Sequence, residues 1–433
     1  MRFPGDRNPK HYFPVTARAT RVDGRDPRAE HRWYLVGLDE VLVDIEIQAP
    51  SSLSSEFGLV PGESMQLNEG QYRRLLARID AEKLARTYAA GGTVANTLNN
   101  FTFLSGEPAV LLGAIESTIR PGEPGFAYVA QSAKAVDLSH LVAVDGSTGT
   151  AITFITPEGD RCFGVAPGVA SEYPPAAVPA SLVQNAAVVL TSLYSLADET
   201  RPIYAAAMRV MALAREADVP IAFGLGTARL VRARRAEVQR LLEGKVTVAA
   251  MNALEAEALT GDADVLENCE RILDWVDAVI ITEGPRGLTI GGYTDDRFKR
   301  ETTDEIRSKS IPEYNRWEFS RLMRRVDCER PIKVYSHTHP YLGGPQRLRS
   351  TSGAGDAALA ALLHDMAANR YHRATVPDSE KHATAARFLT YSSLSRNTQY
   401  ANRVAYEVLR GSSPRLDGPV GHDDEEDAVG PTR

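Results

Sequence analysis

Between residues 187 and 282 the chain alternates short apolar runs with segments of helical periodicity. Four of the runs have the length expected of buried strands: 187–191, 220–224, 246–251 and 279–282. Helices are expected between them over 203–217, 228–242 and 254–259. Parallel strands need a long crossover between them, and that crossover is usually a helix. The pattern therefore predicts an α/β fold with a mainly parallel sheet and helices on both of its faces.

Other segments extend this pattern toward both ends of the chain. Strands are expected at 33–38, 41–47 and 109–113, a helix over 71–90, and a β-hairpin over 150–165. Helices are expected again from Ala354 to about Leu409. Because parallel sheets bind ligands beyond the carboxyl ends of their strands, polar residues that follow a strand are candidates for a site.

The remaining segments suggest a main domain with additions. We expect an N-terminal extension over 1–30, a domain over 31–412 and a disordered acidic tail over 413–433. A charged insertion over 293–349 interrupts the domain. No third metal ligand accompanies its histidines, His337 and His339, so we expect them to have structural or base-contacting roles.

The charge and the cysteines exclude several classes of protein. A net charge of −7 is unlike the basic face of a nucleic-acid binder. The three cysteines, Cys162, Cys269 and Cys328, lack the spacing of a zinc site or a disulfide framework. The first residues do not read as a secretory signal, and no stretch is apolar enough to span a membrane. We therefore expect a cytoplasmic protein with no nucleic-acid or membrane partner.

The segment 350–356, Ser-Thr-Ser-Gly-Ala-Gly-Asp, leads directly into an apolar helix. Its glycines, Gly353 and Gly355, let the backbone approach a ligand closely. The first N–H groups of a helix have no partner within it, and together with the helix dipole they can bind an anion. Asp356 would repel a phosphate, so its place suggests a base that accepts a proton from an attacking hydroxyl. Asp is also common in the first turn of a helix, and this motif alone leaves both interpretations open.

Four further sets of residues lie where a small-molecule kinase needs them. They are Asp44, the segment 91–96, the segment 252–261 and the segment 282–287. Each also has an ordinary structural interpretation, since Asn252 commonly caps a helix and Gly91-Gly92 commonly ends one. Taken singly, none of the four decides between a structural and a functional role.

Taken in their order along the chain, these motifs resemble those of the ribokinase family, the phosphofructokinase-B type of sugar and nucleoside kinases. The resemblance rests on 36–44, 91–96, 252–261, 282–284 and 353–356. It implies a three-layer α/β fold with a small β lid, whose strands would lie within about 41–66 and 148–165. The hairpin around Gly159 resembles the part of this lid that closes over the sugar.

Shorter segments resemble the subfamily of these kinases that acts on inosine and guanosine. They are 3–5, 11–15, 36–40, 334–337, 340–345, 391–394, 400–404 and 413–416. This resemblance implies ATP-dependent phosphorylation of the 5′-hydroxyl of inosine and guanosine. The family motifs read the ribose and the phosphates and not the base, so an adenosine or sugar kinase stays an alternative. From a different class, a nucleoside-binding regulator without catalysis is a second alternative.

The resemblance also implies a role for each matching residue. At the reacting phosphate it implies the base, Asp356, and the anion-hole amides of Gly353, Ala354 and Gly355. On the nucleotide side it implies Asn252 and Glu255, with Glu255 holding Mg²⁺, and the loop residues Thr282, Gly284 and Gly287. On the nucleoside side it implies Asp44, Gly92, Thr93 and Asn96, with Asp39 beside them.

Two positions depart from the family pattern. Many relatives carry an Asp that helps to bind K⁺ where this chain has Ser350, so K⁺ is an open expectation. Leu98 replaces a small residue two positions after Asn96. Because some lids of this family pair their strands between subunits, a homodimer is one expectation for the assembly.

Overall fold

The computed structural model describes residues 33–48, 50–59, 64–84, 86–155, 161–302, 316–345, 352–379, 381–382, 386–411 and 413–416. Several expectations lie outside the described residues: the extension over 1–30, the turn around Gly159, Ser350, and residues 417–433 of the tail. The same holds for 303–315 and 346–349 of the insertion.

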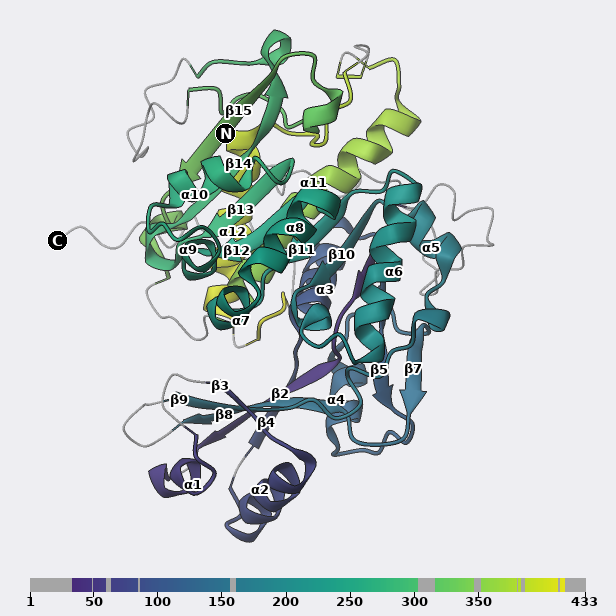
Figure 1. The fold of residues 1–433 in the computed structure, drawn as a ribbon, viewed down its shortest axis with the longest axis vertical. Helices are drawn as coiled ribbons and strands as arrows, with labels where there is room; N and C mark the ends of the chain where they lie inside the picture. The colour runs from purple at the N-terminus through teal and green to yellow at the C-terminus, as the bar shows by residue number, and fades with distance from the viewer. Residues whose placement is uncertain are drawn as a thin grey trace, which may run out of the picture.

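The main sheet has ten strands and is mostly parallel (Figure 1). Its order is β15-β14-β13-β12-β11-β10-β1-β5-β6, with β7 also paired to β5. The strands are β1 (Leu35–Leu38), β5 (Ala109–Glu116), β6 (Val136–Asp137), β7 (Leu141–Val144), β10 (Val188–Ser192), β11 (Ile221–Gly224), β12 (Val248–Asn252), β13 (Ala278–Thr282), β14 (Leu288–Asp295) and β15 (Pro331–Thr338). Only the edge strands β14 and β15 run antiparallel to their neighbours among these. The predicted α/β fold is confirmed.

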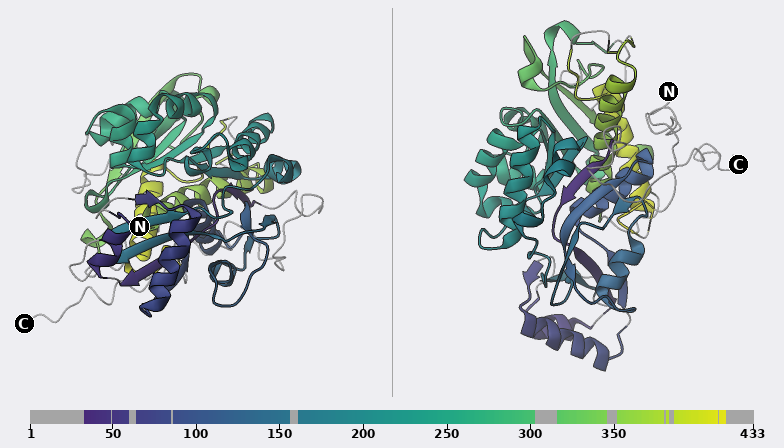
Figure 2. Two further views of the ribbon diagram at one scale, coloured as in Figure 1. Left: turned by 60° about the horizontal axis from the view of Figure 1, so that its bottom comes forward. Right: turned by 90° about the vertical axis from the view of Figure 1, so that its right-hand side faces the viewer.

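Helices cover both faces of this sheet (Figure 2). One core contains Leu35 and Leu111 together with α3 (Thr93–Ser105), α11 (Ala354–Thr375) and α12 (Leu394–Arg410). The other contains Val36 and Leu112 together with α5 (Ala180–Asn185), α6 (Pro202–Glu216), α8 (Arg235–Lys245), α9 (Ala253–Thr260) and α10 (Val265–Ile272). Because side chains alternate along a strand, each buried strand supplies both cores. This explains why the strands read as continuous apolar runs.

Two helix boundaries differ from the predictions. The helix expected over 228–242 is two helices, α7 (Ala228–Ala233) and α8, because the backbone leaves the helical region at Arg234, with φ −127°. The helix expected over 71–90 is α2 (Glu69–Ala81), and Arg86–Ala90 instead forms strand β4. Pairing with β2 (Leu42–Gln48) stabilises that strand. Local periodicity does not report this long-range pairing.

A second sheet of five strands, which we call the lid, lies below the main body in Figure 1. Its order is β3-β9-β8-β2-β4, with β3 (Ser64–Gln66), β8 (Gly149–Ile155) and β9 (Arg161–Ala166). The predicted hairpin is confirmed, since β8 and β9 pair antiparallel. Helices α1 (Ser51–Glu56) and α2 cover the face of the lid turned away from the main body (Figure 1). Only three residues separate β1 from β2, so the lid lies beyond the carboxyl ends of the parallel strands.

The boundary predicted for the acidic tail is four residues too early. Residues 414–416 are buried, and the backbone N–H of Leu416 donates to Asn100 Oδ1 of α3 at 2.7 Å. Asn100 Nδ2 in turn donates to the carbonyl oxygen of Pro414 at 3.5 Å. Charge composition alone placed these residues with the tail, whereas their packing belongs to the main domain. Among the helices of the described residues, none has the length and apolar character needed to cross a membrane.

Candidate active site

Asp356 lies in the first turn of α11, at the carboxyl end of the main sheet. The helix begins after Gly353, whose φ of +82° suits glycine and whose added Cβ would lie 2.4 Å from the carbonyl oxygen of Pro414. The first N–H groups of this 22-residue helix point out of its end, as the sequence predicted. Burial raises the pKa of Asp356 to about 7, and the negative charge of Asp44 raises it further, while a hydrogen bond from Asn96 and the charge of Arg415 oppose that shift.

Asn96 connects Asp356 to an arginine from the end of the described chain. Asn96 Nδ2 donates to Asp356 Oδ2 at 3.1 Å, and Asn96 Oδ1 accepts from Arg415 Nε at 2.9 Å. Arg415 Nη2 also donates to the carbonyl oxygen of Gly91 at 3.1 Å. The structure therefore brings Asp356 and Asn96 together as expected, and it adds Arg415, which the sequence analysis did not assign to the site.

Asp44 lies on lid strand β2, beside the two glycines that precede α3. A Cβ on Gly91 would lie 2.6 Å from Asp44 Oδ2, so the carboxylate packs directly against this backbone. Gly92 has a φ of +87°, and a Cβ there would approach the carbonyl oxygen of Glu40 to 3.2 Å. Burial raises the pKa of Asp44 to about 6, and the charge of Arg415 opposes this. The carboxylate therefore needs a glycine at position 91 to reach the start of the helix, whereas Gly92 is favoured by its backbone conformation.

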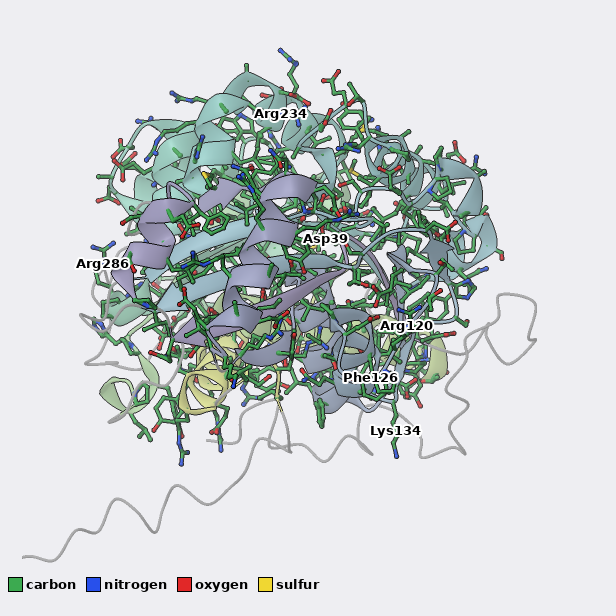
Figure 3. The ribbon with its side chains drawn as sticks, turned by 90° about the horizontal axis from the view of Figure 1, so that it is seen from below. Asp39, Arg120, Phe126, Lys134, Arg234 and Arg286 are labelled. Carbon is green, nitrogen blue, oxygen red and sulfur yellow. The ribbon has the colours of Figure 1, made fainter. Side chains whose placement is uncertain are left out.

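Asp39 follows β1 and is almost completely buried. Its Oδ1 accepts from the backbone N–H of Glu40 at 2.9 Å and from Ser192 Oγ at 3.0 Å. Burial, reinforced by the charge of Glu40, raises its pKa to about 7. In the view from below in Figure 3, Asp39 lies near the middle of the outline of the molecule, whereas Arg286 lies at its edge. The hydrogen bonds give Asp39 a structural role at the end of β1 beside the expected nucleoside residues.

Asn252 and Glu255 form a capping box at the start of α9. Asn252 Oδ1 accepts from the Glu255 N–H at 2.9 Å, and Glu255 Oε2 accepts from the Asn252 N–H at 3.0 Å. Asn252 Nδ2 also donates to Glu255 Oε1 at 2.7 Å. Burial raises the pKa of Glu255 to about 7, and the charge of Asp356 adds to this. The structural interpretation of Asn252 is therefore correct. It is compatible with the functional one, because Glu255 lies close enough to Asp356 for their charges to interact.

The loop between β13 and β14 carries Thr282, Gly284 and Gly287. The backbone N–H of Glu283 donates to the carbonyl oxygen of Gly287 at 2.8 Å, which closes the loop. Gly287 has a φ of +106°, and a Cβ there would lie 2.0 Å from the carbonyl oxygen of Thr338. A Cβ on Gly284 would meet nothing within 4 Å, because this glycine faces open space.

A cavity of about 700 Å³ joins these elements. Its lining includes Asp356, Glu255 and Thr93, the amides of Ala354 and Gly355, and the loop residues Thr282, Gly284 and Gly287. It does not include Asp39, Asp44, Gly92 or Asn96, which lie beyond Asp356 on the lid side. The expected site residues thus fall into a nucleotide-side group around the cavity and a nucleoside-side group under the lid. Thr93, which was expected on the nucleoside side, lines the cavity, and Gly353 does not.

Another part of the cavity wall was not predicted. It contains Tyr341 from the insertion and Asn402 and Tyr406 from α12. The rings of Tyr341 and Tyr406 meet edge to face, with centroids 5.2 Å apart. Such an aromatic corner suits a flat heterocycle. The segments 340–345 and 400–404 carried the subfamily resemblance, but nothing in their local pattern distinguished a cavity wall from an ordinary surface.

The residues of this site suit a divalent cation that phosphates help to hold. In the described part of the chain, no three His, Cys, Asp or Glu side chains gather into a metal site. The negative charge of Asp356 raises the pKa of Glu255, however, and both carboxylates line the cavity. Mg²⁺ typically binds through one or two carboxylates, several waters and the phosphates of a substrate. The donor set therefore fits Mg²⁺ delivered with a nucleotide better than a metal site formed by protein alone.

Comparison with known proteins finds similar sequences and structures among kinases. Residues 125–303 match the model of the pfkB family of carbohydrate kinases. The chain is 40% identical over 418 residues to guanosine-inosine kinase of Escherichia coli K12, covering 96% of each chain. Among solved structures, adenosine kinase from Sinorhizobium meliloti superposes with a TM-score of 0.66 at 17% identity, covering 92% of this chain and all of that one. A "probable sugar kinase protein" from Rhizobium etli CFN 42 gives 0.67 at 17% identity, covering 92% and 99%.

Proposed function

Since the chain belongs to the pfkB family of carbohydrate kinases, we propose that it transfers the γ-phosphoryl group of ATP to the 5′-hydroxyl of inosine and guanosine. The products are IMP and GMP. The substrate assignment is supported by the near full-length similarity to guanosine-inosine kinase, because the adenosine and sugar kinases resemble this chain in fold alone.

One observation carries the proposal. Asp356 lies at the end of the cavity beside the N-terminus of α11, and its other side contacts Asn96 under the lid. A nucleotide in the cavity and a nucleoside under the lid would meet at this carboxylate. In-line transfer needs the attacking and leaving oxygens on opposite sides of the phosphorus atom, which this arrangement permits.

In the proposed reaction, Asp356 accepts the proton of the 5′-hydroxyl as that oxygen attacks the γ-phosphorus atom. The bond from O5′ to phosphorus forms, and the bond from phosphorus to the β–γ bridging oxygen breaks, so that ADP leaves with the electron pair. A base with a pKa near 7 is well matched to this task at neutral pH. The N–H groups of Gly353, Ala354 and Gly355 would stabilise the charge on the transferred group.

We assign the other residues by their place relative to this step. Asp44 would accept hydrogen bonds from the ribose hydroxyls, and Gly92, Thr93 and Asn96 would line the rest of the ribose site. Glu255 would hold a divalent cation, Mg²⁺, through water, and a cation there would offset the charge of the β- and γ-phosphates. The loop from Thr282 to Gly287 and the aromatic corner of Tyr341 and Tyr406 would enclose the nucleotide.

The test is a phosphorylation assay with ATP and Mg²⁺ on inosine, guanosine, adenosine, ribose and fructose. We expect product with inosine and guanosine and much less with the other three. Turnover chiefly of adenosine or of a sugar would overturn the substrate assignment and keep the fold and the mechanism. Binding of inosine without any turnover would instead favour a nucleoside-binding regulator.

A further inference from the structure

The acidic site contains a buried arginine to which the proposed mechanism gives no role. Arg415 is 7% exposed, and its guanidinium lies 5.6 Å from the ring centroid of Tyr128. It acts electrostatically on both Asp44 and Asp356, and its charge lowers the pKa of each. Burying a charge costs free energy unless it is paired, so an arginine at this place needs partners of opposite or polar character.

Those partners form an ordered relay from Arg415 to Asp356. Nε–H of Arg415 donates to Asn96 Oδ1 at 2.9 Å, which leaves Asn96 Nδ2 to donate to Asp356 Oδ2 at 3.1 Å. An amide side chain that turned over would place its NH₂ group against the guanidinium, donor against donor. Arg415 therefore fixes the orientation of Asn96, and Asn96 fixes the orientation of Asp356.

The residues around Arg415 tie this relay to both sides of the site. Residues 413–416, which we call the strap, pack between α3 and the start of α11. Arg415 Nη2 bonds the carbonyl oxygen of Gly91, where lid strand β4 leads into α3. Pro414 packs against Gly353, where a Cβ would lie 2.4 Å from its carbonyl oxygen. The strap thus contacts the junction of the lid and the glycine of the expected anion hole at once.

We propose that Arg415 is a positioning residue for the phosphoryl transfer, acting through Asn96 to hold Asp356 toward the attacking hydroxyl. This inference rests on the proposed function, in which Asp356 is the general base. Arg415 does not line the cavity, so its role concerns the nucleoside side and not the nucleotide side.

The first test replaces Arg415 in the full chain by Gln and by Lys. Arg415→Gln keeps a hydrogen-bond donor and removes the charge. We expect kcat/KM for the nucleoside to fall about 100-fold, the effect of misplacing a reacting group by about 1 Å, with KM for ATP unchanged. Arg415→Lys keeps the charge but replaces the planar guanidinium with a single ammonium group. We therefore expect kcat/KM to fall less in Arg415→Lys than in Arg415→Gln.

The pH profile of kcat/KM separates positioning from a purely structural role. Apart from the uncharged Asn96, the groups that face Asp356 are Asp44 on β2, Glu255 on α9, Tyr194 after β10 and Arg415. Since the charge of Arg415 lowers the pKa of Asp356, its loss raises that pKa. The acid limb of the profile should therefore move to higher pH in Arg415→Gln and stay close to its original position in Arg415→Lys. An unmoved limb in Arg415→Gln would overturn the proposal.

Arg370 provides a matched control. It too is an arginine stacked near an aromatic ring, Trp33, and it donates to the backbone carbonyl of Ala186. Arg370→Gln should lower the melting temperature without moving the acid limb. If it moves the limb as Arg415→Gln does, the shift reflects general loosening and the proposal fails.

One further measurement does not depend on turnover, and another does not depend on a single substitution. The loss of unfolding free energy in Arg415→Gln should grow as pH rises through the pKa values of Asp44 and Asp356, about 6 and about 7, because the ionised carboxylates are its partners. A loss that is constant with pH would contradict the electrostatic relay. Chains that end after 412 and after 416 should differ in kcat/KM, since only the shorter one lacks the strap.

These measurements also distinguish the two hypotheses. If the unchanged protein does not phosphorylate inosine or guanosine, the proposed function fails, while the pH dependence of stability still tests the relay. If the unchanged protein is active and Arg415→Gln matches it in rate and in pH profile, only the inference about Arg415 fails.

Discussion

The nucleotide side of the site contains short local motifs, whereas the nucleoside side contains side chains from distant parts of the chain. The predicted part of the cavity consists of backbone N–H groups, glycines and a capping box. Each of these comes from a segment of fewer than eight residues. Under the lid, side chains meet that are far apart in the sequence: Asn96 and Asp356 are separated by 260 positions, and Asn96 and Arg415 by 319. A short sequence motif can specify the nucleotide side, whereas the residues of the nucleoside side come together only in the complete fold.

Asp356 belongs to both sides, and its substitution should have the largest effect. We expect Asp356→Asn to lower kcat by a factor of about 10² to 10⁴, the usual contribution of a general base, for inosine and guanosine alike. The same substitution at the exposed Asp378 is the control and should leave kcat unchanged. Near-normal turnover of the Asp356→Asn variant would show that Asp356 is not the general base. The two sides of the site would then share no catalytic residue.

Glu255 tests the nucleotide side. Gln at this position can still accept from the Asn252 N–H, so the capping box and the melting temperature should survive in Glu255→Gln. The charge that would hold Mg²⁺ through water is lost, and we expect kcat to fall about 100-fold, with more Mg²⁺ needed for half-maximal activity. A variant with an unchanged dependence on Mg²⁺ would show that the carboxylate serves only as a cap.

Asp44 tests the nucleoside side. Asp44→Asn should lower kcat/KM for inosine by about 10- to 100-fold, because hydrogen bonds from the ribose to a charged acceptor are replaced by weaker ones. KM for ATP should stay the same, since Asp44 lies outside the cavity lining. An equal loss on both substrates would mean that the two sides are not separable, and the contrast drawn above would not hold.

Substitutions at two glycines of the nucleotide loop should have the smallest effects. We expect them to lower the free energy of unfolding more clearly than they lower activity. Gly287→Ala places a Cβ 2.0 Å from the carbonyl oxygen of Thr338 at a φ of +106°, so we expect a loss of about 1–3 kcal/mol of unfolding free energy. Gly284→Ala meets open space at a φ of +59° and should lose about 1 kcal/mol. Urea unfolding of the pair measures the difference. Equal losses would indicate that the loop relaxes around the added methyl group.

The same contrast explains what the sequence predicted. The parallel sheet, the hairpin of the lid and the helix that begins at Ala354 follow from local periodicity and glycine placement, and all three are present. The motif around Asn252 and Glu255 was located correctly because a capping box is defined within four residues. Strand β4 was missed, since Arg86–Ala90 is extended only through its pairing with β2.

Tyr341 and Tyr406 show why half of the cavity could not be predicted. They are 65 positions apart and meet because β15 and α12 pack together. Arg415 was harder still to predict, since it lies eight positions before Asp423, where an acidic run that resembles a solvated tail begins. Neither residue type nor spacing separates such a side chain from the charged surface that surrounds it.

The position of the strap has a consequence for how the protein acquires activity during synthesis. Arg415 follows every other residue of the site in chain order, and domains begin to fold while the ribosome is still adding residues. The main sheet and the lid can form before the strap emerges, but closing a loop of more than 300 residues onto Asn96 must wait for it. A nascent chain would then be folded and able to bind ATP for some time before Asp356 is held in place. Emergence of the strap would itself act as the last step in forming the site.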